Sequence, residues 1–180
     1  MPKTLISTNT AASDPAVITI TGMDDTYPVY EFHFINIHPG TDGQIFQFQV
    51  NNVTDGADFN DSPITSATFR AYHGEDGSSD AILYRSGMDE DNAANYQDLS
   101  EYNSTDNDSS LSGILTLYGP SSIVYVKHFI AETNDNYGGS SMANYHVAGY
   151  INDTKAIDEI NFKFSDGDIQ SGTIKMYGVT

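Results

Sequence analysis

Apolar and polar residues alternate along much of this chain. In residues 45–50, Phe46, Phe48 and Val50 fall on one face of an extended segment, and glutamines fall on the other. Residues 160–164 and 173–177 show the same alternation. A period of two is typical of a strand that is buried on one face, as in antiparallel sheets.

Two segments are apolar on both faces. Residues 29–37 (VYEFHFINI) and 123–130 (IVYVKHFI) are rich in aromatic and β-branched residues, so we expect them to form central strands. The same reasoning gives further strands at residues 16–21, 66–72, 81–85, 96–100, 114–118 and 145–151. Because turn sequences rich in Gly, Asn and Asp separate these segments, the pattern predicts an all-β protein, an antiparallel and jelly-roll-like β-sandwich.

Domain organisation follows from where the strands lie. Residues 1–16 are small and polar, and we expect an extended N-terminal arm there, followed by a single β-sandwich domain over residues 17–180. The polar segment 87–110 has strands on both sides, so we expect it to be a surface excursion of that domain.

One short sequence recurs. SGILTLYG at residues 112–119 resembles SGTIKMYG at residues 171–178. Two strands of one sandwich can meet the same steric demand, or the recurrence can mark a pseudo-symmetric pair of sheets or an old duplication.

Charge narrows the range of partners. The chain has 25 acidic and 7 basic residues, a formal net charge of −18, and its lysines and arginines are not clustered. Binding to nucleic acid or to an anionic membrane depends on clustered basic residues, so we expect neither partner. A strongly solvated surface is the simplest interpretation of the charge, and the alternative is adaptation to high salt or docking on a cation-rich partner.

Catalytic motifs are missing from the sequence. The chain has no cysteine and no Gly-x-Ser-x-Gly motif, and its five histidines do not show metal-binding spacing. We therefore expect a protein that is not an enzyme and has no cofactor.

Calcium is the one ion that the loops suggest. Asp106 and Asp108 flank Asn107, and Asp166 and Asp168 flank Gly167, so each loop offers alternating oxygen ligands. Neither loop follows the EF-hand pattern, and such triplets also arise by chance in a chain this rich in aspartate.

Three tyrosines are candidates for ligand binding. Tyr96, Tyr102 and Tyr137 lie in polar segments, where an exposed ring can stack on a sugar or anchor a protein interface. The alternative is that these rings only cover the rim of the sandwich.

Several long segments carry a resemblance to a known class of protein. They are VYEFHFINIHPGTDGQIFQFQV (29–50), FRAYH (69–73), YVKHFIAETN (125–134) and VAGYINDTKAIDEINFKFSDGDIQSGTIKMYGV (147–179). Together they resemble small β-sandwich virion proteins of tailed bacteriophages, notably those of marine hosts.

The resemblance implies a structural protein of the virion, assembled in the host cytoplasm. The favoured role is a capsid decoration or cement protein, a homo-oligomer that binds the major capsid protein or other virion proteins through its arm and edge strands. One alternative is a tail adaptor or fibre-associated module that binds a host glycan. The other is a free carbohydrate-binding or hydrolytic protein.

Overall fold

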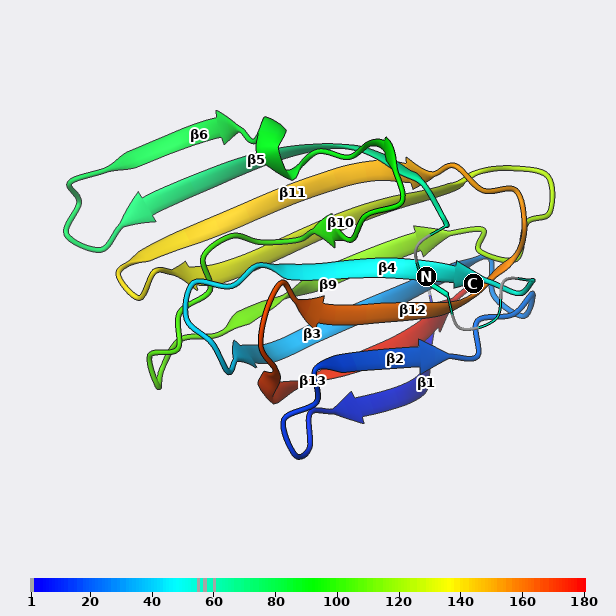
Figure 1. The fold of residues 1–180 in the computed structure, drawn as a ribbon, viewed down its shortest axis with the longest axis horizontal. Coiled ribbons are helices and arrows are strands. Elements are labelled where there is room, and N and C mark those ends of the chain that lie inside the picture. The colour runs from blue at the N-terminus through cyan, green and yellow to red at the C-terminus, as the bar shows by residue number, and fades with distance from the viewer. Residues whose placement is uncertain (1, 55, 57, 60) are drawn as a thin grey trace.

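Two antiparallel sheets pack face to face in this computed structural model, which describes residues 2–54, 56, 58–59 and 61–180 (Figure 1). The large sheet contains, in spatial order, β1 (Lys3–Thr10), β13 (Ile169–Val179), β3 (Val29–Pro39), β9 (Leu111–Tyr118), β10 (Lys127–Tyr137), β11 (Ser141–Ile151), β5 (Ile64–Gly74) and β6 (Asp80–Tyr84), with β7 (Asp91–Ala93) on β5. The small sheet contains β2 (Val17–Thr21), β12 (Ile157–Phe164), β4 (Phe46–Asn52) and β8 (Gln97–Asp98). The prediction of an antiparallel β-sandwich is confirmed.

Aromatic rings fill the space between the sheets. The ring centroid of Phe162 lies 5.6 Å from that of Phe32 and 5.1 Å from that of Phe34, so a ring of the small sheet sits between two rings of the large one. Phe46 and Phe48 of β4 are also fully buried. The alternating apolar residues of segments 45–50 and 160–164 therefore form the inner face of the small sheet.

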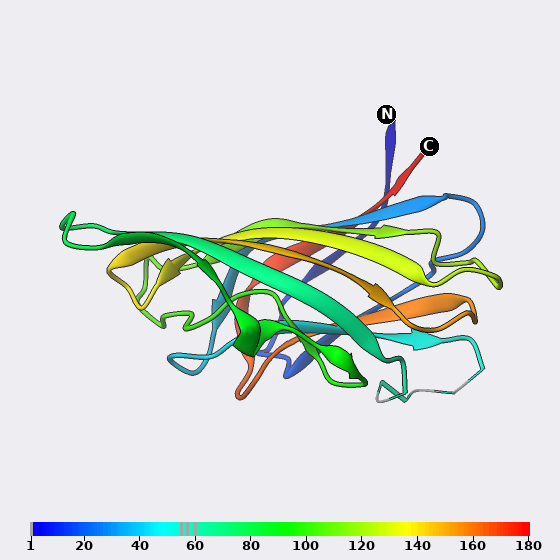
Figure 2. The same cartoon turned by 90° about the horizontal axis from the view of Figure 1, so that it is seen from above.

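The chain crosses between the sheets repeatedly, while β9, β10 and β11 form a meander within the large sheet. The small sheet lies against one face of the large sheet, and among the described residues no strand or helix covers the opposite, outer face (Figure 2). The only helix in the described part of the chain is η1 (Ser86–Met88). Among the described residues there is therefore no helix that is long and apolar enough to cross a membrane.

The N-terminal segment belongs to the large sheet. Residues 3–10 form β1, which pairs antiparallel with β13 from Lys3 opposite Val179 to Thr10 opposite Thr173. The sequence predicts an arm apart from the domain, because this segment contains few apolar anchors. Backbone pairing explains the difference, since an edge strand needs ladder hydrogen bonds more than it needs buried side chains.

The recurring sequence forms two strands of the same sheet. β9 and β13 pair with opposite sides of β3, so the recurrence does not correspond to a pair of sheets. A Cβ at Gly113 would lie 2.3 Å from the carbonyl oxygen of Glu132, and one at Gly172 would lie 2.7 Å from that of Asn36. Both glycines therefore allow a neighbouring backbone to approach closely. This supports the interpretation that the sequence recurs because the two strands meet the same steric demand.

Gly113 offers a direct test of this packing. We expect Gly113→Ala to lower the free energy of unfolding by about 1–3 kcal/mol, because the backbone of β10 would have to move. Gly87→Ala is the matched control, since nothing lies within 4 Å of the added Cβ there. Urea denaturation measures both, and equal stability of the two variants would contradict the steric explanation.

Candidate interaction site

Three consecutive apolar side chains project from the connection between β9 and β10. Ile123, Val124 and Tyr125 are 77%, 65% and 74% exposed, and we call these three residues the apolar tip. The sequence predicts a central strand from residue 123, and this part of the prediction is wrong. The strand begins at Lys127, and the apolar run before it lies outside the sheet.

Hydrogen bonds hold the apolar tip in a defined shape. The hydroxyl of Ser122 accepts from the backbone N–H groups of Val124 (3.2 Å) and Tyr125 (2.9 Å). Ser122 N–H donates in turn to the carbonyl of Gly119 at 3.0 Å, which closes a turn. A pre-organised apolar segment loses less conformational entropy on binding than a flexible one.

Lys127 anchors the end of the loop. Its side chain is fully buried, and its Nζ donates to the carbonyl of Asp153 at 2.9 Å and to that of Lys155. Burial lowers the pKa of this ammonium, and the nearby Asp153 opposes the shift. These bonds fix the start of β10, so the three apolar side chains before it point away from the core.

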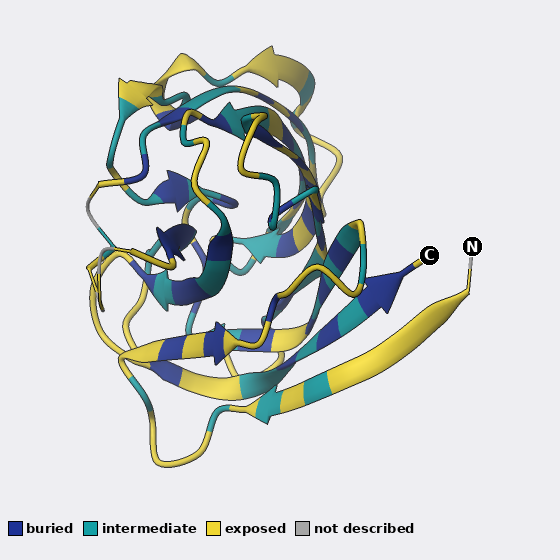
Figure 3. Ribbon diagram, turned by 90° about the vertical axis from the view of Figure 1, so that its right-hand side faces the viewer, coloured by how far each residue is buried: buried dark blue, intermediate teal, exposed yellow. Residues whose placement is uncertain are grey.

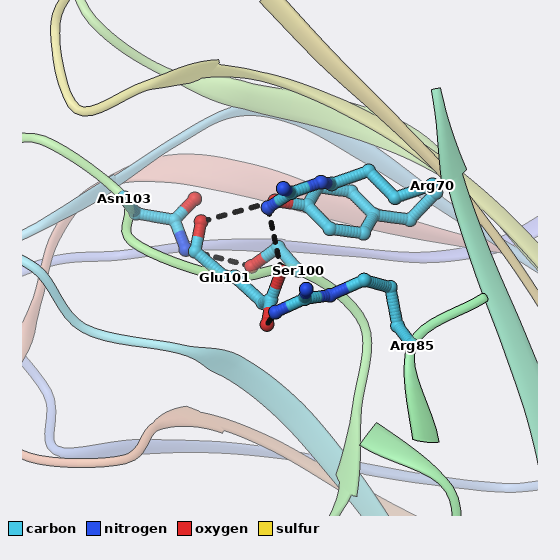
Figure 4. A network of polar contacts seen from close by, with 6 residues as sticks. Arg70, Arg85, Ser100, Glu101 and Asn103 are labelled. Carbon is cyan, nitrogen blue, oxygen red and sulfur yellow. Dashed lines mark hydrogen bonds and ion pairs between the residues drawn. The ribbon is translucent and has the colours of Figure 1, made fainter. Parts of the chain in front are cut away.

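A buried polar network lies beneath segment 87–110 (Figure 4). Glu101 pairs with Arg70 of β5 at 2.7 Å and also with Arg85. Tyr145 donates from its hydroxyl to the Glu101 carbonyl at 3.3 Å, and Asn103 donates to Ser100 Oγ at 2.6 Å. The network thus ties the polar segment to the inner face of the large sheet, and Leu99, Ser100 and Asn103 of this segment are buried.

Asp135 of β10 is the unusual member of this region. It is 3% exposed, and neither of its carboxylate oxygens accepts a hydrogen bond from the described residues. Burial raises the pKa of Asp135 to about 8, with Arg70 opposing the shift and Glu101 adding to it. A carboxyl group in this position is more stable when protonated.

Two of the three candidate tyrosines meet beside Arg70. The Arg70 guanidinium lies 4.7 Å from the ring centroid of Tyr137 and 5.0 Å from that of Tyr72. Tyr137 in turn lies 5.7 Å from Tyr102, whose side chain is 52% exposed. Tyr96 is not part of this stack: its hydroxyl accepts from Asn161 Nδ2 at 3.2 Å.

A polar hollow of about 450 Å³ lies at one end of the large sheet. Its lining contains Asn36, His38, Asp108, Gln170 and Ser171, with Asn107, Ser109 and Ser110 completing it. The Nδ1–H of His38 donates to the Ser109 carbonyl at 2.7 Å. Such amide, hydroxyl and carboxylate groups can hydrogen-bond a sugar, but the lining contains no Tyr, Phe or Trp ring on which a sugar could stack.

The calcium candidates lie in two separate loops. Asp106 and Asp108 are exposed in segment 103–110, and Asp166 and Asp168 are exposed in the turn between β12 and β13. Within the described ranges, no three His, Asp or Glu side chains are grouped so as to hold a metal ion.

Sequence reasoning missed the apolar tip, Arg70 and Asp135. A short apolar run predicts a strand equally well whether it is paired or projects from a loop. The strand predicted around Lys127 ends at residue 130, whereas β10 continues to Tyr137, so the sequence does not predict that Asp135 lies on an inner face. No local signal in the sequence marks which strand residues meet across the sheet.

Comparison with known proteins adds no relative: no family model, curated protein or solved structure matches this chain.

Proposed function

We propose that this protein is a non-catalytic structural component that docks on a larger protein assembly, with a capsid decoration protein of a tailed phage as its favoured form. The apolar tip is the observation that carries the proposal. Three large apolar side chains, held in a defined turn and exposed to water, are typical of a segment that a partner covers.

The energetics favour a protein partner. Burying each of these side chains contributes roughly 1.5–3 kcal/mol. An anionic membrane surface is a poor alternative, because a chain of net charge −18 is repelled from it. The resemblance to phage virion proteins supports a capsid as the assembly, and the major capsid protein as the partner.

A triple variant of the apolar tip tests this proposal. We expect Ile123→Ser, Val124→Ser and Tyr125→Ser together to weaken binding at least about 100-fold, which corresponds to a loss of about 3 kcal/mol. Purified phage particles from the culture that carries the gene are the probe, and co-sedimentation of labelled protein measures the binding.

The control removes apolar surface elsewhere. Ile130→Ser with Met142→Ser alters two exposed residues of the outer face and should leave binding unchanged. Equal binding of the triple variant and wild type would refute the role of the tip. Absence of wild-type binding to the particles would refute docking on a capsid.

Glycan binding is the second candidate, as part of a tail adaptor, a fibre-associated module or a free carbohydrate-binding protein. The exposed ring of Tyr102 at the end of the stack beside Arg70 favours it, because such a ring can stack on a sugar. A glycan array separates binding of this kind from docking on a protein.

A further inference from the structure

The edge strand β6 is exposed on three sides. Ile82 and Tyr84 on its outer face are 78% and 67% exposed, and Leu83 on the inner face is 37% exposed. Its pairing partner β5 occupies only one edge, so the backbone along the other edge faces solvent (Figure 3).

Two of the other edge strands of the sheets, β1 and β8, are protected. β1 begins with Lys3 and contains a register shift between Leu5 and Ser7, and both features discourage pairing with another chain. β8 has only two residues. β6 pairs with β5 without a bulge and has three adjacent apolar residues, so it lacks these protections.

The hydrogen bonds of the hairpin show which backbone groups are free. Gly74 N–H donates to the Ser79 carbonyl, and Arg85 N–H donates to the Thr68 carbonyl, both at 2.8 Å. Because antiparallel bonding alternates along a strand, residues 79, 81, 83 and 85 bond to β5. Asp80, Ile82 and Tyr84 therefore present their N–H and C=O groups to solvent.

These three residues are spaced symmetrically about Ile82. We propose that β6 pairs with β6 of a second copy, antiparallel and with Ile82 opposite Ile82 on the twofold axis. Asp80 of each copy then lies opposite Tyr84 of the other, and all outward backbone groups on these residues find partners.

Charge also favours this orientation over a parallel one. Antiparallel pairing brings the Asp80 end of each strand beside the Arg85 end of the other, whereas in-register parallel pairing would place like ends together. The net charge of −18 on each chain opposes association at low salt. Added NaCl should therefore strengthen the dimer.

Sedimentation equilibrium of the purified chain tests the dimer, and because no phage particle is needed, its outcome is independent of the proposed function. We expect a mass twice the 19.6 kDa of the chain, and a monomer for Ile82→Pro. Proline at this position removes an N–H that β5 does not use, so the variant should fold, which its thermal melt verifies.

Single cysteines test the register, since the chain has none of its own. The Cα atoms of the two residues 82, which face each other across the twofold axis, would lie about 5.5 Å apart, within the range that a disulfide can span. Ile82→Cys should form linked dimers at least about tenfold faster than Ile123→Cys, a control at a residue of nearly equal exposure, 77%.

Three results would overturn the proposal. They are a monomeric wild type at every concentration, equal linking rates for the two cysteine variants, and a series of masses beyond the dimer. The last would indicate that β6 pairs with a different edge, such as β1, and assembles without closing.

Discussion

Arg70→Met should lower the free energy of unfolding by about 3–5 kcal/mol at pH 7, the cost of breaking a buried ion pair from one side. Arg70 is 6% exposed and pairs with Glu101 at 2.7 Å. Methionine would fill much of the volume but leave the Glu101 carboxylate without its buried cation. It would also lose the contacts of the guanidinium with the rings of Tyr72 and Tyr137.

Arg85→Met is the matched control, because Arg85 binds the same Glu101 carboxylate from a side chain that is 34% exposed. A partly exposed pair contributes less than a buried one, so this variant should lose clearly less stability than Arg70→Met. Urea denaturation measures the free energy of unfolding of both variants. Similar decreases for the two would contradict the larger contribution assigned to the buried Arg70. Adding Glu101→Gln to Arg70→Met should restore part of the loss.

Asp135→Asn should stabilise the protein, by about 2–5 kcal/mol at pH 8. The pKa of Asp135 in the folded protein is about 8, above the ordinary value of 3.8 for an aspartate. The unfolded chain therefore releases this proton at a lower pH than the folded one. As the pH rises from about 4 to about 8, ionisation of the unfolded chain draws the equilibrium toward unfolding, and asparagine removes that loss.

The stabilisation should consequently depend on pH. Near pH 4 the carboxyl group is protonated in the folded state and still about half protonated in the unfolded chain, so the two states differ little in bound protons and Asp135→Asn should change stability little. Urea denaturation at pH 4.5 and pH 8 measures the difference, with the exposed Asp108→Asn as the control that should change neither value. An effect of Asp135→Asn that is equal at both pH values would contradict the assigned pKa.

The sheets could be predicted from the sequence because one-sided burial leaves a visible period of two. Phe46, Phe48 and Val50 are all fully buried, as their spacing requires. β1 could not be predicted in the same way, because its side chains are largely exposed and backbone pairing alone places it in the sheet. The polar end of β10 could not be predicted either, because Asp135 faces the core there but has asparagines as its neighbours in the sequence.

The interaction site was less predictable than the fold. The polar surroundings of Tyr102 and Tyr137 make them candidates, and the fold brings the two rings together. Arg70 joins them through long-range strand pairing, which no local sequence pattern predicts. The sequence predicts a strand at the apolar tip, because composition does not distinguish a buried strand from a projecting turn. In the structure, the hydrogen bonds of Ser122 and Lys127 hold this segment as a turn outside the sheet.

The most direct test of the central claim, that this protein docks on a virion, is its location in phage particles. Antibodies raised against the purified chain and coupled to gold would be applied to particles from the source culture and viewed by negative-stain electron microscopy. Gold distributed over the heads is the predicted result. Gold confined to tails would support the tail-adaptor alternative, and particles without gold would contradict a structural role in the virion.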